Sequence, residues 1–213
     1  MGSVLDIYLG ENPESFDYNG KEYTPHSFAD KLNINSDDYI ELTSYIRYPY
    51  YGQSILEVPD NWTNGEYYNV PIDDLMEVID YAIENGYSVV WDGDTSEKTF
   101  YRKKGYAVIP VDEENESDDE ELTEPEKEKV ITQEMREETF ENFLTTDDHL
   151  MHITGIAEDQ EGTKFYYTKN SWGTKYKYDG FWYMSESFVR LKTIAVMVHR
   201  DAVPEEIVTK LGI

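Results

Sequence analysis

Two short segments in the second half of the chain carry polar residues that could act together in acid–base chemistry. His149 opens a strand-like apolar stretch directly after the polar turn 145–148, and Asn170 ends the next such stretch. Because an unpaired polar side chain inside an apolar strand is costly, both residues are expected to have polar partners. An amide oxygen that accepts from one imidazole nitrogen fixes the tautomer and leaves the other nitrogen free to exchange a proton. These residues therefore indicate a histidine base oriented by an asparagine.

A β-hairpin would bring this pair together. Two strand-like stretches, 150–157 and 164–169, are joined by a short polar turn that ends in glycine. In an antiparallel pair the start of one strand lies beside the end of the next, so His149 is expected near Asn170. Trp172 follows closely, and its indole could cover the pair, exclude water and strengthen the hydrogen bond.

The sequence contains no cysteine, which limits what the pair can do alone. A histidine with an orienting asparagine normally activates a thiolate in the Cys–His–Asn form of the catalytic triad. Serine could substitute, but no Gly-x-Ser-x-Gly elbow occurs, and strand alternation is expected to turn Ser171 to the opposite face. A chain without cysteine can fold in either redox environment. The isolated chain is expected to be inactive.

The residues around the pair resemble the histidine and asparagine motifs of papain-like cysteine peptidases. The dipeptide Asp148-His149 is followed by Gly155, as in that family. The next strand ends in Lys-Asn-Ser-Trp-Gly at 169–173, and Gly-Phe at 180–181 enters a further strand. The second motif is the more specific of the two.

Three further segments are similar to one branch of this family, the bleomycin hydrolases and aminopeptidases C: 4–10, 68–75 and 198–204. The resemblance implies that the chain is the C-terminal half of such an aminopeptidase, with His149 as the base and Asn170 as the residue that orients it. It also implies hydrolysis of peptide bonds without a cofactor or metal. The cysteine would come from an N-terminal half that nothing in this sequence matches.

The resemblance adds three weaker candidates for contact with substrate. It places Trp91 and Asp92 near the cleft, at the end of a strand expected over 87–91, although Trp91 is most simply a core aromatic residue. In bleomycin hydrolases the C-terminus lies in the cleft and limits cleavage to the first residues of the substrate, so Ile213 is the third candidate. The expected partners are a peptide substrate, the N-terminal half and, through the exposed cleft wall, further copies of the chain.

A non-catalytic module that keeps the peptidase scaffold and binds a peptide or protein is the alternative function. It would use the cleft wall or the aromatic-rich first third of the chain. A Cys-Trp dipeptide preceded by glutamine in the upstream sequence would favour the enzyme, whereas a natural start at Met1 would favour the binding module. Residues 1–3 resemble an expression leader joined to mid-protein sequence, so we expect the natural protein to extend upstream.

Two metal-site hypotheses are weaker than their alternatives. His149 and His152 are three positions apart, and in a strand this spacing turns the imidazoles to opposite faces, so zinc is not expected. The acidic run 112–128 lacks the invariant glycine of an EF-hand loop, which favours a mobile surface loop over a calcium site. His26 and His199 have no informative local pattern.

The composition disfavours several classes of partner. The 213 residues include 45 acidic and 18 basic side chains, a formal net charge of −27, and such a charge repels nucleic acid and anionic membrane surfaces. No apolar run approaches the roughly 20 residues of a membrane span, and no signal peptide is recognisable. We expect a soluble protein. The family resemblance is compatible with either the bacterial cytoplasm or export to the periplasm, and the sequence does not choose between them.

The expected fold class is α+β, with an antiparallel sheet or barrel-like unit flanked by helices. Helices are expected over 27–32, 71–86, 132–144 and 204–212, and strands over 87–91, 106–110, 150–157, 164–169, 180–185 and 193–199. We expect residues 1–68 to form an extension or insertion that packs on the domain, and residues 69–213 to form the papain-like domain that carries the histidine and asparagine.

Overall fold

The computed structural model describes residues 2–111 and 127–213 and divides the chain into two units after Asp38. The acidic loop expected at 112–128 lies outside the described residues, except for its last two positions. Unit 1 contains α1 (Gly2–Leu9), β1 (Phe16–Tyr18), β2 (Lys21–Tyr23), α2 (Pro25–Leu32) and the 3₁₀ turn η1 (Ser36–Asp38). Of these, a helix over 27–32 was predicted, close to α2. The strands β1 and β2 have three residues each, too few for a clear apolar alternation.

Unit 1 is organised around a small aromatic cluster. The strands β1 and β2 form an antiparallel hairpin. Phe28 of α2 packs edge-on against three rings of that hairpin, those of Phe16, Tyr18 and Tyr23. Thr24 and Ser27 cap the start of α2 with reciprocal side-chain to backbone hydrogen bonds, which accounts for a helix at this position.

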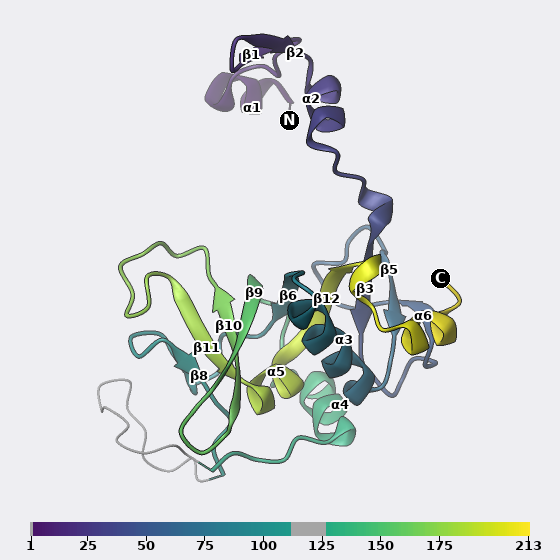
Figure 1. Cartoon of the computed structure of the whole chain (residues 1–213), viewed down its shortest axis with the longest axis vertical. Coiled ribbons are helices and arrows are strands. Elements are labelled where there is room, and N and C mark those ends of the chain that lie inside the picture. Colours follow the sequence, from purple (N-terminus) through teal and green to yellow (C-terminus); the bar gives the residue numbers. More distant parts are fainter. Residues whose placement is uncertain (1, 112–126) are drawn as a thin grey trace. The chain divides into compact units, whose positions relative to one another are not determined.

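Unit 2 is built, within the described residues, on one ten-stranded sheet (Figure 1). The strands are β3 (Tyr39–Thr43), β4 (Gly52–Ile55), β5 (Glu66–Asn69), β6 (Val89–Gly93), β7 (Phe100–Tyr101), β8 (Tyr106–Ala107), β9 (His149–Glu158), β10 (Lys164–Lys169), β11 (Phe181–Ser185) and β12 (Thr193–His199). Their order is β4-β5-β3-β12-β6-β9-β10-β11-β8-β7. Neighbours run antiparallel except for the β3–β5 and β8–β11 pairs.

Helices pack on this sheet and complete the core. They are α3 (Ile72–Glu84), α4 (Gln133–Glu141), α5 (Glu186–Lys192), the 3₁₀ turn η2 (Arg200–Ala202) and α6 (Glu205–Leu211). Pro71 and Pro204 stand one position before α3 and α6, where a missing N–H has no cost. The apolar face of α3, including Leu75 and Ile79, shares one core with Val89 of β6. The expected α+β class is confirmed.

Residues 39–68, which we expected to belong to the extension, supply β3, β4 and most of β5 to this sheet. The strand β3 pairs with β12 along its whole length, and the hydroxyl group of Thr43 donates to the carbonyl oxygen of Ile194 at 2.7 Å. The structure therefore divides after Asp38 rather than after residue 68. A pairing between segments so far apart in sequence leaves no local pattern from which it could be predicted.

Candidate active site

His149 begins β9, Asn170 directly follows β10, and their side chains are in contact. His149 Nε2 lies 2.9 Å from Asn170 Oδ1, and the same oxygen accepts the backbone N–H of Ser171 at 2.7 Å. An amide oxygen only accepts, so the proton of the neutral imidazole belongs on Nε2 and Nδ1 remains free. Asn170 is 5% exposed and His149 is half-buried, so the amide group is shielded while the imidazole stays accessible.

A β-bulge in β9 determines which histidine meets Asn170. The hairpin pairs regularly from its turn up to Gly155, after which the register shifts and Thr154 is left as the extra residue. In a regular ladder His152 would lie opposite Asn170 and share its inner face. The bulge instead turns His149 inward, and His152 is exposed. The sequence therefore predicted that His149 lies near Asn170, but it did not predict the β-bulge that turns His149 toward this residue.

Trp172 lies against the imidazole. Its ring centre is 5.0 Å from that of His149. On its core side, the indole packs against Phe100 and Trp182, whose ring centres lie 6.1 Å and 5.5 Å away. The guanidinium group of Arg102 lies 5.2 Å from the indole centre. Trp172 therefore packs between the His149 imidazole and the aromatic core.

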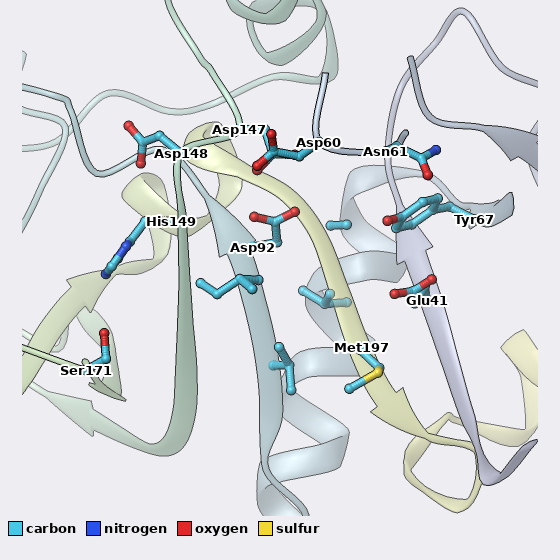
Figure 2. A pocket seen from close by; sticks show the side chains of 14 residues that line it. Glu41, Asp60, Asn61, Tyr67, Asp92, Asp147, Asp148, His149, Ser171 and Met197 are labelled. Carbon is cyan, nitrogen blue, oxygen red and sulfur yellow. The ribbon is translucent and has the colours of Figure 1, made fainter. Parts of the chain in front are cut away.

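His149 lines a pocket of about 560 Å³ that also has an acidic wall. Figure 2 shows the carboxylate groups of Asp60, Asp92 and Asp147 on one side of His149. Burial is the main reason that the pKa of Asp92 rises to about 8, and the charge of Asp147 and a hydrogen bond to it raise this pKa further. Burial also raises the pKa of Asp147. This pair therefore retains a proton close to neutral pH.

The weaker sequence candidates occupy different settings. Asp92 lines the pocket. Trp91 is fully buried, and its Nε1 donates to the hydroxyl group of Thr193 at 2.7 Å, so its indole belongs to the core and does not line the pocket. Ile213 packs against the hydrophobic core next to α6 and is also absent from the pocket lining. His152 is exposed and contacts a serine hydroxyl group at 2.7 Å.

Ser171 corrects one expectation. It lines the same pocket as His149 rather than turning to the opposite face. The reason is that β10 ends at Lys169, so the alternation of a strand no longer applies at Ser171.

Four acidic residues of the pocket were not predicted as substrate contacts: Glu41, Asp60, Asp147 and Asp148. Asp60 lies in an irregular segment without a recognisable pattern, and Asp147 lies in the polar turn before β9. Its position two residues before His149 was the one available signal. Within residues 2–111 and 127–213, no three acidic or histidine side chains gather as a possible metal site. No helix in the same ranges is long and apolar enough to cross a membrane.

The fold is papain-like, and it places a contacting histidine and asparagine beside a tryptophan and an open pocket. The structure is similar to that of PepW from Lactobacillus rhamnosis HN001, with a TM-score of 0.71 and 20% identity over 99% of this chain and 48% of PepW. The model of the Peptidase C1-like family matches residues 3–212. The chain belongs to this family.

Two curated relatives are aminopeptidases. Aminopeptidase G of Lactobacillus delbrueckii subsp. lactis is 26% identical over 211 residues, which cover 92% of this chain and 46% of the relative. Aminopeptidase C of Lactobacillus helveticus is 26% identical over 140 residues, which cover 65% and 28%. The chain thus spans less than half the length of these relatives. The resemblance to the aminopeptidase branch of the papain-like peptidases is confirmed, and the closer likeness to bleomycin hydrolases stays a prediction.

Proposed function

We propose that this chain supplies the histidine and asparagine of a papain-like cysteine aminopeptidase, and that another polypeptide segment brings the nucleophilic cysteine. The observation that carries the proposal is the 2.9 Å contact between His149 Nε2 and Asn170 Oδ1 on the wall of an open pocket. Family membership and the two aminopeptidase relatives support it. An imidazole acts in this way only on a thiol within hydrogen-bond reach, so the chain alone has no peptidase activity.

In the assembled site, Nδ1 of His149 takes the proton of the cysteine thiol, which gives a thiolate and an imidazolium. The thiolate attacks the carbonyl carbon of the scissile bond, and the imidazolium then gives its proton to the departing amine. His149 next takes a proton from water, which hydrolyses the thioester and restores the thiol. Throughout, Asn170 Oδ1 holds the Nε2 proton, so that Nδ1 remains the nitrogen that exchanges protons.

The acidic side of the pocket is complementary to a substrate with a free amino terminus. Asp92 and Asp147 line the same pocket as His149, and an α-ammonium group carries the charge opposite to theirs. An aminopeptidase must recognise this group, so we place it beside the two carboxylates. An ammonium ion favours the ionised form of a neighbouring carboxyl group, and substrate binding would therefore release the proton that the pair retains.

The experiment is to assemble this chain with a cysteine-bearing polypeptide that corresponds to the unmatched part of the aminopeptidase relatives. Hydrolysis of an aminoacyl fluorogenic substrate is then compared with hydrolysis of its N-acetylated form. We expect activity on the free amine alone. The variant His149→Ala should lose at least about a hundredfold in kcat, while His152→Ala, the matched control on the same strand, should retain activity.

A stable complex of the two polypeptides that hydrolyses neither substrate would refute the proposal. That result would favour the alternative, a non-catalytic module that binds a peptide or protein.

A further inference from the structure

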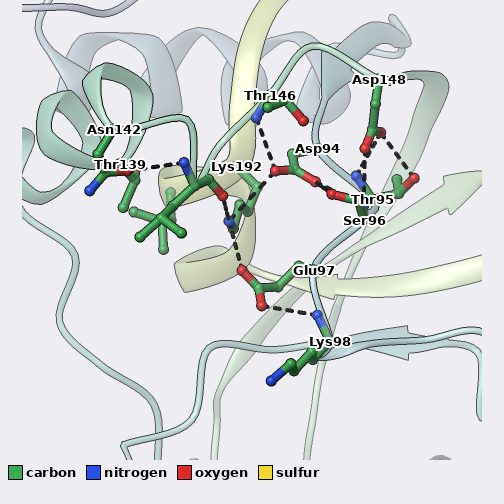
Figure 3. Close-up of polar contacts among 12 residues, drawn as sticks. Asp94, Thr95, Ser96, Glu97, Lys98, Thr139, Asn142, Thr146, Asp148 and Lys192 are labelled. Atoms are coloured by element: carbon green, nitrogen blue, oxygen red, sulfur yellow. Dashed lines mark hydrogen bonds and ion pairs between the residues drawn. The ribbon is translucent and has the colours of Figure 1, made fainter.

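A buried ammonium group binds the turn that leads into His149. Lys192, the last residue of α5, is 1% exposed. Its Nζ donates to the carbonyl oxygen of Leu144 at 2.8 Å and pairs with Glu97 Oε2 at 2.7 Å. The carboxylate of Asp94 lies 3.7 Å from the same nitrogen (Figure 3). Leu144 begins the irregular turn that ends at His149.

Two carboxylates extend this restraint along the turn. Asp94 Oδ2 accepts the backbone N–H of Thr146 at 3.0 Å. Asp148 Oδ1 accepts the backbone N–H of Thr95 at 2.9 Å and its hydroxyl group at 3.2 Å. Asp148 Oδ2 accepts the backbone N–H of Ser96 at 3.1 Å. Lys192 and the loop after β6 therefore hold every second residue of the turn, as Figure 3 shows.

Stability alone is a weak reason for this arrangement. Burial of an ammonium group beside carboxylates carries a desolvation cost, and a well-packed apolar side chain often serves stability equally well. An apolar side chain could fill the volume of Lys192, but it could not bind the Leu144 carbonyl oxygen or attract Asp94. The turn lies outside helices and strands. Besides the side-chain contacts, two backbone hydrogen bonds hold it, from Thr145 to the carbonyl oxygen of Thr139 at 2.9 Å and from Asp148 to that of Gly93 at 3.4 Å. A catalytic group must be placed within about 0.5 Å, so this path matters for His149.

We propose that Lys192 is a positioning residue: together with Asp94 it fixes the turn before β9 so that His149 Nε2 meets Asn170 Oδ1. Lys192 itself is buried and does not line the pocket. Its catalytic consequence rests on the proposed function, whereas its effect on the imidazole can be measured in this chain alone.

The test is ¹⁵N NMR of the histidine rings in the full chain. Lys192→Met retains the length of the side chain without the ammonium group, and Asp94→Asn retains the shape while replacing one accepting oxygen by a donor. Lys164→Met is the matched control, because Lys164 pairs with Asp80 and Glu186 outside this network. The wild type and the control should show a single Nε2–H tautomer for neutral His149. Both network variants should lose it and show averaged ring shifts, with His152 unchanged.

Folded Lys192→Met and Asp94→Asn chains with unchanged His149 shifts would overturn the proposal. If Lys192→Met does not fold, the Asp94→Asn result decides. A wild-type His149 without the Nε2–H tautomer would refute the His149–Asn170 contact, and with it both the proposed function and the role of Lys192. In the assembled peptidase, positioning predicts a reduced kcat at nearly constant KM, which a simple loss of folded protein would not produce once active sites are counted.

Discussion

Replacement of Asp92 by asparagine should remove a pH dependence from the stability of this chain. In the folded protein the pKa of Asp92 is raised to about 8, chiefly by burial and then by Asp147, whereas an unfolded aspartate titrates near 3.9. Between these values, folding takes up a proton. A raised pKa means that stability is fully present below about pH 4 and is lost as the pH rises through about 8.

The magnitude follows from this linkage. Uptake of one proton lowers the free energy of unfolding by about 1.4 kcal/mol per pH unit. Because Asp92 is only partly buried, solvent screening shortens the pH interval over which this slope applies, and we expect a total effect of roughly 2 kcal/mol between pH 4 and pH 8. Asparagine resembles the protonated carboxyl group and can still donate to Asp147. The Asp92→Asn variant should therefore equal the wild type near pH 4 and exceed it by about 2 kcal/mol at pH 8.

The assay is urea unfolding at unit steps from pH 4 to pH 8, followed by fluorescence and circular dichroism so that two-state behaviour is checked. Asp179→Asn is the control, since Asp179 is exposed and does not line the pocket. It reports the effect of one charge fewer in a chain of net charge −27. Parallel stability curves for the wild type and Asp92→Asn would refute the reasoning, because a proton held by Asp92 must separate them.

Three further predictions concern the same site. Gly93 pairs with His149 across β6 and β9, and a Cβ at Gly93 would clash with an indole ring and a backbone carbonyl group. In urea unfolding, Gly93→Ala should therefore lower the unfolding free energy by about 2 kcal/mol or more. The control Gly52→Ala should not lower it, because a Cβ at Gly52 meets only ordinary contacts. Asn170→Ala should lower kcat of the assembled enzyme about tenfold or more without a comparable change in KM, because the imidazole loses its fixed tautomer; an unchanged kcat would show that Asn170 does not orient His149. Asp92→Asn should raise KM for a free-amine substrate more than it lowers kcat. A KM equal to that of the wild type would show that Asp92 does not bind the substrate's ammonium group.

The elements predicted well are those with long apolar patterns between polar turns. The strands β10 and β12 have the expected bounds, 164–169 and 193–199, and α3 lies within the helix expected over 71–86. The helix α5 was missed, although Ser185 accepts the backbone N–H of Phe188 as an N-cap should. Seven residues are too few for a helical period to stand out beside the flanking strands.

The site was predictable only as far as it is local. A hairpin predicts that His149 lies near Asn170, because the two residues flank one short connection. The choice between the two histidines of β9 depends on the bulge at Thr154. The adjacent Gly155 is a local signal for such a bulge, and it was not interpreted in this way. The acidic wall joins Asp60, Asp92 and Asp147, which come from three separated segments. The strand order β5-β3-β12-β6-β9 brings these segments together.

The central claim is that His149, oriented by Asn170, activates a thiol supplied by another polypeptide segment. The most direct measurement is the rate of iodoacetamide alkylation of that segment's cysteine between pH 5 and pH 8, alone and in complex with this chain. We expect the wild-type chain to accelerate alkylation most at the acidic end of this range. A thiolate paired with an imidazolium persists there, whereas an unpaired cysteine is a protonated thiol. His149→Ala should abolish the acceleration. An alkylation rate that does not depend on the chain, or one that His149→Ala leaves unchanged, would contradict the claim.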